Sequence, residues 1–302
     1  MSDFQISGTT LKKYTGKDKV VHIPEGVQTI ESFAFYESKI TEVFLPSSVK
    51  SIESEAFVES SSLCHVHLNE GLARIDDCAF KDTSLMEISM PDTLTLLGWS
   101  VFQNTKIQKV DFSKNLEYIP VQCFADTPLK RIVIPDTISE IEASAFENCK
   151  KLEEVYMPKS LTSFGYSDEY FGFTFAHCEK LRKITIPKGV NVIYEGMFTG
   201  CTSLCEVTFK TDFLHHIDHN AFANCQALKT ITIPRCDSID KSVFYPISTD
   251  TKIFLDDKTY QNNMDFVLEY PGCVFAKNSI EGLLQANKSL KNINEILIEK
   301  DR

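Results

Sequence analysis

The chain has 302 residues, of which 43% are hydrophobic and 24% are charged, so it is long enough to bury a core and too mixed in composition to be disordered. Its 42 acidic and 31 basic side chains give a formal net charge of -11, which would repel a phosphate backbone and argues against a nucleic-acid partner. No stretch approaches the roughly 20 apolar residues of a membrane-spanning helix, and the start of the sequence lacks the basic and apolar regions of a signal peptide. We therefore expect no membrane insertion.

The first segment, residues 1–17, is expected to form an N-terminal cap. Phe4-Gln-Ile6, a Ser-Gly turn and the run from Leu11 to Tyr14 suit a β-hairpin that covers an open sheet edge.

A repeat fills residues 18–250. About ten units recur at intervals of 22–24 residues, with one of 29, and each begins with Leu or Ile except a first copy that begins near Asp18. Each unit reads as a short strand with Val or Ile at alternate places, in most copies a proline, then an apolar bend, and finally a tight turn around a phenylalanine. The aliphatic unit starts are Ile40, Leu63, Leu85, Ile107, Leu129, Leu152, Leu181, Leu204 and Leu228.

Ten of the 22 phenylalanines occupy one column of this repeat. They are Phe35, Phe57, Phe80, Phe102, Phe124, Phe146, Phe175, Phe198, Phe222 and Phe244. A single unit cannot bury its apolar side alone, whereas stacked units share one continuous core. The column therefore predicts a row of buried rings along a solenoid.

The unit from Leu129 to Cys149 shows the pattern L-x-x-I-x-I-P followed by A-F-x-x-C, and it resembles the BspA-type (Treponema pallidum-like) leucine-rich repeat. The resemblance implies a right-handed leucine-rich-repeat solenoid of the α/β horseshoe type, with a parallel β-sheet on its concave face. It also implies binding of other macromolecules, and it does not imply a catalytic site.

The last segment, residues 251–302, is expected to form a C-terminal cap because the repeat pattern is lost after Ile253 and Phe254. Residues 278–290 can be helical with aliphatic side chains on one side, and residues 288–302 form a charged tail.

The third and fifth positions of each unit must point outward if the fourth and sixth point into the core. This exposed face mixes charges with aromatic and apolar side chains, as the centres of interfaces do, although an ordinary solvated sheet face would also carry Thr and charged residues. The candidate partner-binding residues are His22, Phe44, His65, His67, Glu87, Lys109, Asp111, Arg131, Val133, Glu154 and Tyr156.

A second candidate surface lies in the 29-residue unit, where six extra residues between Phe164 and Phe173 must leave the stack as a loop. The alternative is a loop folded back on the convex side. The candidate contact residues are Tyr166, Asp168, Glu169, Tyr170 and Phe171.

Four of the ten cysteines, namely Cys149, Cys178, Cys201 and Cys225, follow the column phenylalanine by three residues in successive units. No C-x-x-C pair occurs, so small buried thiols are favoured over disulfides or metal ligands. Unpaired thiols suit a reducing compartment.

The histidines give the best remaining metal signal. His65 and His67 lie on one face about 7 Å apart, and His215, His216 and His219 cluster with Asp218. Neither group has four ligands at a standard spacing, so we expect no metal and no other cofactor.

Phosphate-loop, dinucleotide-binding, nucleophile-elbow and H-E-x-x-H motifs are absent, so we expect no enzyme. A metal-dependent enzyme at the histidines is the least favoured hypothesis.

These observations predict a non-catalytic scaffold or adhesion module that binds a protein on the concave sheet face. The alternative is a glycan or small-ligand recognition module that uses the aromatic and histidine strip. The missing signal peptide and the free cysteines favour the cytoplasm, while the family resemblance favours the cell surface or secretion if the sequence has been trimmed.

Overall fold

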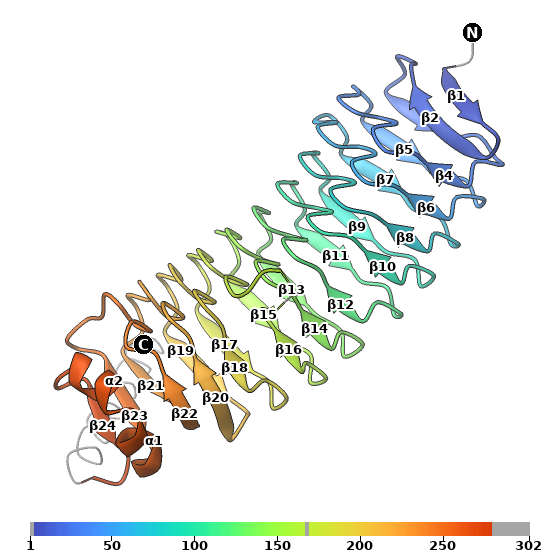
Figure 1. Cartoon of the computed structure of the whole chain (residues 1–302). Helices are drawn as coiled ribbons and strands as arrows, with labels where there is room; N and C mark the ends of the chain where they lie inside the picture. The colour runs from blue at the N-terminus through green and yellow to red at the C-terminus, as the bar shows by residue number, and fades with distance from the viewer. Residues whose placement is uncertain (1–2, 167–168, 280–302) are drawn as a thin grey trace, which may run out of the picture.

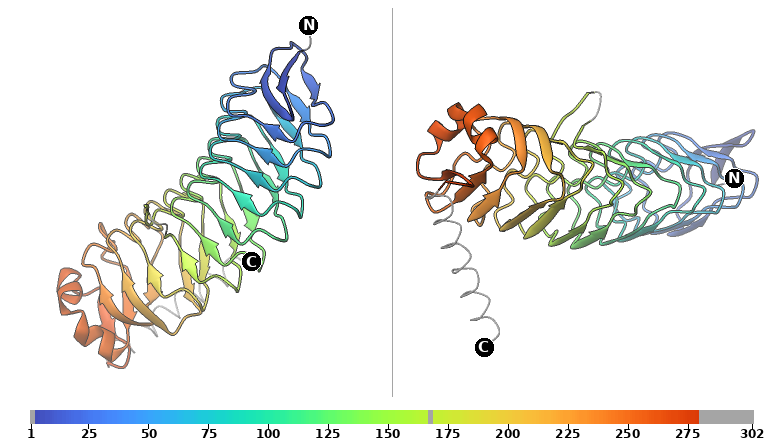
Figure 2. Two further views of the ribbon diagram at one scale, coloured as in Figure 1. Left: turned by 45° about the vertical axis from the view of Figure 1, so that its right-hand side comes forward. Right: turned by 90° about the horizontal axis from the view of Figure 1, so that it is seen from below.

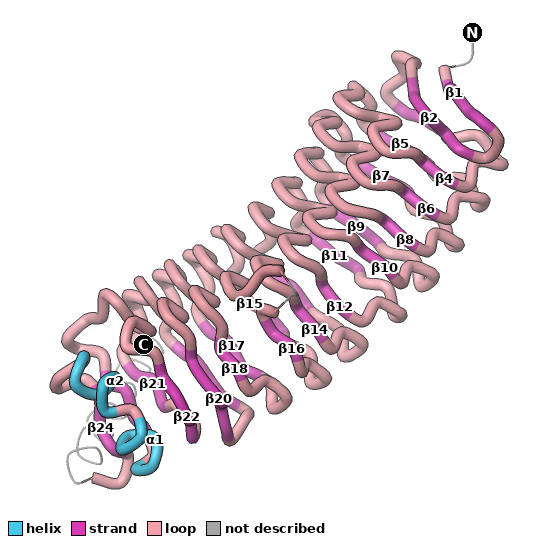
Figure 3. Tube along the Cα trace, viewed as in Figure 1, coloured by secondary structure: helices cyan, strands magenta, loops and turns pink. Residues whose placement is uncertain are grey.

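The computed structural model of the chain describes residues 3–166 and 169–279. These residues form an elongated, gently curved solenoid in which successive turns lie side by side from the N-terminus to the C-terminal end (Figures 1 and 2). Each turn contains two short strands joined by loops, and helices occur only near the C-terminal end of the described chain (Figure 3). The expected leucine-rich-repeat solenoid with parallel strands is therefore confirmed.

The first strand of each turn covers the third to fifth positions of the repeat unit. Neighbouring strands pair in parallel with equivalent residues side by side, for example Val20 with Glu42 and Glu42 with His65. The first strands are β3 (Val20–His22), β5 (Glu42–Phe44), β7 (His65–His67), β9 (Glu87–Ser89), β11 (Lys109–Asp111), β13 (Arg131–Val133), β15 (Glu154–Tyr156), β17 (Lys183–Ile186), β19 (Glu206–Phe209), β21 (Thr230–Thr232) and β23 (Lys252–Leu255).

The repeat pattern predicts an apolar bend at the second apolar position of each unit. In the structure these residues form short strands, and the strands of successive turns pair in a second ladder. A residue such as Ile30 points inward here and pairs with its equivalent, Ile52, in the next turn. These second strands are β4 (Thr29–Ile30), β6 (Ser51–Ile52), β8 (Arg74–Ile75), β10 (Leu96–Leu97), β12 (Tyr118–Ile119), β14 (Glu140–Ile141), β16 (Ser163–Phe164), β18 (Val192–Ile193), β20 (Phe213–Ile217) and β22 (Arg235–Ile239).

At the N-terminal end, β1 (Phe4–Ser7) and β2 (Thr10–Tyr14) form an antiparallel hairpin, and β2 pairs in parallel with β4. The hairpin thus covers the open edge of the second-strand ladder.

At the C-terminal end, β24 (Val274–Ala276) pairs with β23, and two short helices, α1 (Asp257–Asn262) and α2 (Met264–Glu269), follow β23. The side chains of Thr259 and Asn263 accept hydrogen bonds from the N–H groups of Cys236 (2.9 Å) and Ile239 (2.7 Å), which satisfies the edge of β22. The helix expected over residues 278–290 lies outside the described residues apart from its first two positions, and the domain boundaries after residues 17 and 250 stay predictions.

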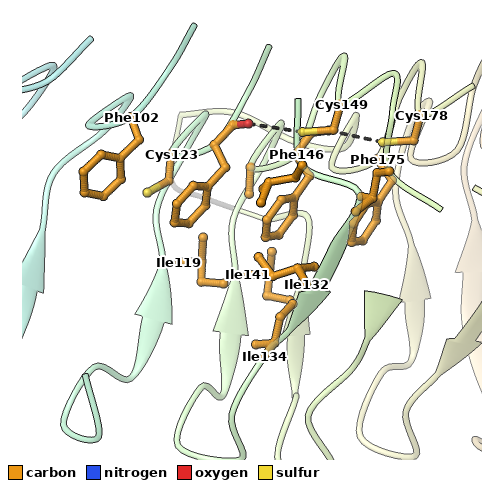
Figure 4. Packing of buried hydrophobic residues seen from close by; sticks show 14 of the residues in the cluster. Phe102, Ile119, Cys123, Ile132, Ile134, Ile141, Phe146, Cys149, Phe175 and Cys178 are labelled. Atoms are coloured by element: carbon orange, nitrogen blue, oxygen red, sulfur yellow. Dashed lines mark hydrogen bonds between the residues drawn. The ribbon is translucent and has the colours of Figure 1, made fainter. Parts of the chain in front are cut away.

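The core is the predicted row of phenylalanine rings. All ten are buried, and neighbouring rings from Phe35 to Phe244 stack with centroids 4.6 to 6.1 Å apart and planes within 17° of parallel. Figure 4 shows Phe102, Phe146 and Phe175 in this row, with isoleucines of both strands packed below them. Burial of each ring stabilises the fold by about 2–3 kcal/mol.

The turn is tight around nine of the ten column phenylalanines, all except Phe244, because the residues two before and two after each ring have left-handed backbone angles. For Phe146 these are Ser144 (φ 54°) and Asn148 (φ 57°). The amides of all three residues donate to carbonyl groups of the next turn at 2.8 to 3.0 Å, so hydrogen bonds also join the turns at this corner.

The four cysteines of the ladder line the inner side of this corner. Each thiol lies 3.1 to 3.3 Å from a phenylalanine carbonyl of the preceding turn, such as Cys149 Sγ to Phe124 O (Figure 4). Three earlier units place threonine here, and the Thr127 hydroxyl donates to the Phe124 carbonyl of its own turn at 2.8 Å. Hydroxyl and thiol therefore both bond phenylalanine carbonyls at this corner, the hydroxyl within a turn and the thiol between turns.

Candidate functional site

The outward side chains of the first strands form one surface, which we call the first-strand face. Val43 is buried while Glu42 and Phe44 on either side of it point outward, and the same alternation recurs along the ladder. All eleven residues predicted from the repeat lie on this face. Phe44 and His65 are half-buried, and the other nine are exposed.

A stack of three rings runs along the N-terminal part of this face. His22, Phe44 and His67 occupy the same position in successive turns, with centroids 4.4 and 4.0 Å apart and planes within 9° of parallel. His67 Nε2 also lies 2.7 Å from Glu42 Oε1. Because both faces of the Phe44 ring are covered, this stack offers ring edges and imidazole nitrogens to a partner rather than a flat ring face.

Charges on the middle of the first-strand face are paired with one another. Lys109 and Asp111 are 2.7 Å apart within one strand, and Arg131 Nε lies 3.6 Å from Glu154 on the neighbouring strand. These pairs are exposed, so they contribute little to stability. Their arrangement sets a pattern of alternating charge that a partner must match.

A shallow hollow of about 450 Å³ lies beside Tyr156 and is lined by Glu153, Glu154, Val155, Tyr156, Arg182 and Lys183. The Arg131 guanidinium lies over the Tyr156 ring at 4.6 Å, and the tyrosine hydroxyl donates to Glu154 at 3.2 Å. One face of this exposed ring is therefore already occupied by a cation.

The hollow lies where the pairing between successive turns of the solenoid is interrupted. In the described residues, β15 does not pair with β17 and β16 does not pair with β18, and this is the one junction between turns where both ladders are broken. The turns stay joined at the phenylalanine corner, where Phe173, Phe175 and His177 donate to the next turn at 2.7 to 3.0 Å. The break coincides with the 29-residue unit.

The inserted segment of that unit forms a hairpin. Gly172 N–H donates to Gly165 O at 2.6 Å, and Tyr166 and Phe171 form an antiparallel bridge above this base. Figure 2 shows this segment projecting from the solenoid and tilting toward its N-terminal half. Tyr166, Glu169, Tyr170 and Phe171 are exposed, whereas Asp168 lies outside the described residues.

Two further aromatic residues, which the repeat pattern does not single out, contact this hairpin. The Tyr170 ring meets Trp99 edge to face at 5.7 Å, and the Tyr166 ring lies 5.9 Å from Tyr194. Trp99 comes from a unit far from the hairpin in sequence. An apolar residue at an exposed position of the repeat is the only sequence signal that marks Trp99.

The histidines pair with carboxylates. His219 Nε2 lies 2.7 Å from Glu195, and His216 Nε2 lies 3.5 Å from Asp218. In residues 3–166 and 169–279, no group of three or more His, Cys, Asp or Glu side chains is arranged to hold a metal ion.

Burial controls the chemistry of the thiol ladder. It raises the pKa of Cys149 to about 12 and the pKa values of Cys178 and Cys201 well above their ordinary range. Since the thiolate is the reactive form, these cysteines are poor nucleophiles near neutral pH.

Within the part of the chain that the structure describes, no helix is long and apolar enough to cross a bilayer.

Comparisons with solved structures give the following similarities. A leucine-rich repeat protein from T. pallidum is 24% identical, covers 75% of this chain and 88% of its own, and has a TM-score of 0.38. A leucine-rich repeat protein from Bacteroides ovatus is 19% identical with coverage of 89% and 94% and a TM-score of 0.45. The pneumococcal vaccine antigen PcpA is 18% identical with coverage of 91% and 94% and a TM-score of 0.42. No curated protein matches the chain.

The family comparison agrees with the repeat pattern. The BspA type leucine rich repeat region matches residues 13–104, 65–171, 117–250 and 169–295, which together span most of the sequence. The chain belongs to the BspA-type leucine-rich-repeat family.

Proposed function

We propose that this chain is a non-catalytic scaffold that binds a protein through its first-strand face. Leucine-rich-repeat proteins of this kind are generally interaction or adhesion scaffolds. The observation that carries the proposal is the ordered stack of His22, Phe44 and His67, which presents a preformed aromatic strip beside fixed charges. Aromatic side chains that are already ordered lose little entropy on binding, which suits them to the centre of an interface.

The ring geometry favours a protein over a glycan at this strip. Sugar rings stack on flat aromatic faces, but Phe44 is covered on both faces and Tyr156 carries Arg131 on one face. Ring edges and imidazole nitrogens instead suit the carbonyls and hydroxyls of a polypeptide.

The second candidate function, glycan or small-ligand recognition, is favoured by the hollow beside Tyr156. Its volume of about 450 Å³ and its polar lining by Glu154, Arg182 and Lys183 suit a hydroxyl-rich ligand. A carbohydrate array probed with the whole chain and with Tyr156→Ala tests this function.

The proposal is tested by a pull-down that compares the wild-type chain with a Phe44→Ala, His67→Ala, Tyr156→Ala variant whose circular dichroism is unchanged. A Thr185→Ala variant on the same face serves as the matched control. We expect a protein captured by the wild-type and control chains to be lost by the triple variant. Equal capture by all three would contradict a binding site on this part of the face.

Localisation stays a prediction. The free thiols favour the cytoplasm, whereas a similar solved protein from Faecalibacterium prausnitzii is described as a cell surface protein. Fractionation of the source cells followed by detection of the intact chain distinguishes the two locations.

A further inference from the structure

The hairpin at residues 165–172 is part of a larger aromatic surface. The Trp99 ring (38% exposed) contacts Tyr170 (51%) at 5.7 Å, and the Tyr166 ring (38%) contacts Phe171 (53%) and the half-buried Tyr194 at 5.9 Å each. We call these five residues the hairpin aromatic surface. It lies on the second-strand side of the solenoid and is therefore separate from the first-strand face.

The solenoid beneath the hairpin is adapted to it. Val121 and Ala143 occupy the place three residues before the column phenylalanine in the two turns between Trp99 and the hairpin base, and they are only 4% and 1% exposed. Other turns place polar side chains here, such as Asp77 and His219, and both are exposed. Apolar residues thus replace polar ones in the two turns that the Tyr170–Trp99 contact spans.

The surroundings of this surface are acidic. The second-strand segments 116–122, 138–144, 161–166, 169–173, 190–196 and 214–220 contain no Lys or Arg. Their carboxylates are Glu117, Glu140, Glu142, Glu169, Glu195 and Asp218, of which Glu195 and Asp218 lie beside His219 and His216. The first-strand face differs, because its carboxylates alternate with Lys and Arg and pair with them.

Two tyrosines on this side have raised pKa values, mainly because they are partly buried. Burial raises the pKa of Tyr118, and the charges of Glu142, Asp77 and Glu140 raise it further. Burial likewise raises the pKa of Tyr194, with smaller contributions from Tyr166 and Asp218. Negative charge around exposed rings is the environment in which Lys and Arg side chains bind most favourably, through cation–π contacts and ion pairs.

We propose that the hairpin aromatic surface binds an extended peptide segment rich in Lys and Arg. Cationic side chains of the peptide would lie against the exposed rings of Tyr170, Phe171 and Trp99, and the carboxylates of the neighbouring turns would supply the opposite charge. This site does not depend on the first-strand face. Because the two sites lie on different sides of the solenoid, the chain has room for two partners at once.

The chain carries its own reporter for the test, because Trp99 is its single tryptophan. The full chain is titrated with a synthetic peptide of alternating Arg and Ser while Trp99 fluorescence is recorded at low and at high salt. We expect a saturable change in fluorescence. The affinity measured from it should fall as salt rises, because salt screens exposed ion pairs. A peptide with Glu in place of Arg should give no change.

The decisive comparison is a Tyr170→Ala, Phe171→Ala variant, which keeps the net charge of the chain. We expect it to lose affinity by about tenfold or more, the loss that follows when aromatic contacts at the centre of a site are removed. A Glu140→Gln, Glu169→Gln variant, which keeps the rings, should bind several-fold more weakly than the wild type. Thr185→Ala, on the first-strand face, should bind as the wild type does.

Three results would overturn the proposal. Equal binding by the Tyr170→Ala, Phe171→Ala variant would show general attraction to an acidic chain, and equal binding of the Glu peptide would show that charge is not recognised. Absence of any saturable change would show that the surface does not bind cationic peptides. Circular dichroism of each variant establishes that it is folded, and the Gln variant tests the site even if loss of the two rings disturbs the hairpin.

Discussion

At Gly172 the backbone has φ +74°, and a Cβ atom there would lie 1.9 Å from the carbonyl oxygen of Glu195 in the next turn. The same residue closes the base of the hairpin through its hydrogen bond to Gly165. Glycine is thus required at this position for two reasons: the left-handed backbone angle and the close approach of the neighbouring backbone.

We expect Gly172→Ala to destabilise the chain strongly, by more than the roughly 1–2 kcal/mol that a left-handed alanine costs alone. The matched control is Gly8→Ala, because Gly8 also has a positive φ of +60° but a Cβ there meets nothing within 4 Å. Urea unfolding of both variants measures the difference. Equal losses would mean that the backbone of Glu195 moves away at little cost.

The Thr174 hydroxyl is buried and has no hydrogen-bond partner among the described residues. We expect Thr174→Val, which keeps the shape and removes the hydroxyl, to leave stability unchanged or to raise it by about 1 kcal/mol. Thr127→Val is the comparison, since the Thr127 hydroxyl donates to Phe124 O at 2.8 Å, and we expect it to cost about 1 kcal/mol. Thermal unfolding measures both, and a clear loss for Thr174→Val would reveal a partner for its hydroxyl.

At the scale of the element, the thiol ladder and the stacked phenylalanines form one corner of the solenoid. The thiols of Cys149, Cys178 and Cys201 are fully buried against the carbonyls of column phenylalanines, and burial disfavours the charged form. Burial therefore holds the folded-state pKa of Cys149 near 12 against an ordinary value of 9.0. Because the folded chain keeps its thiol protonated while the unfolded chain releases the proton, alkaline pH favours unfolding.

This linkage predicts how stability depends on pH. The stability that comes from keeping the buried thiol protonated is fully present below pH 9.0. As pH rises from there toward 12, the free energy of unfolding falls by up to about 1.4 kcal/mol per pH unit for each thiol. We expect the free energy of unfolding to fall more steeply between about pH 9 and about pH 12 for the wild type than for Cys149→Ala. Urea unfolding in the presence of reductant checks this, and parallel curves would contradict it.

For the molecule as a whole, the 29-residue unit divides the solenoid into two parts that remain joined at the phenylalanine corner. In the described residues the amides of Arg182, Asn191 and Tyr194 donate no hydrogen bond across the junction. Their equivalents one turn later do so, since Cys205 and His215 donate to Arg182 O and Asn191 O at 2.9 and 2.7 Å. The insertion thus separates the strands while the core stays continuous.

Amide hydrogen exchange should show this junction directly. We expect the amides of Arg182, Asn191 and Tyr194 to exchange faster than those of Cys205, His215 and Asp218, which are bonded across the next junction. Exchange followed by mass spectrometry on overlapping peptides resolves the two turns. Equal protection of both sets would mean that the two ladders close at this junction in solution.

Much of the architecture was predictable because the repeat imposes the same environment on every turn. The buried phenylalanines, the inward Val and Ile and the outward candidate residues follow from position within the unit, since a strand alternates sides and stacked units bury the same columns. The second strands were harder to predict, because two residues are too few to show a period and their ladder depends on neighbouring turns.

The candidate surfaces divide in the same way. The sequence by itself determined which residues share the first-strand face, because periodicity assigns them to it. Only the tertiary structure decided that His22, Phe44 and His67 stack, that the inserted hairpin tilts toward Trp99, and that both ladders break at one junction. These features depend on contacts between turns and on a segment that departs from the repeat, and a periodic pattern carries no information about where such a segment comes to rest.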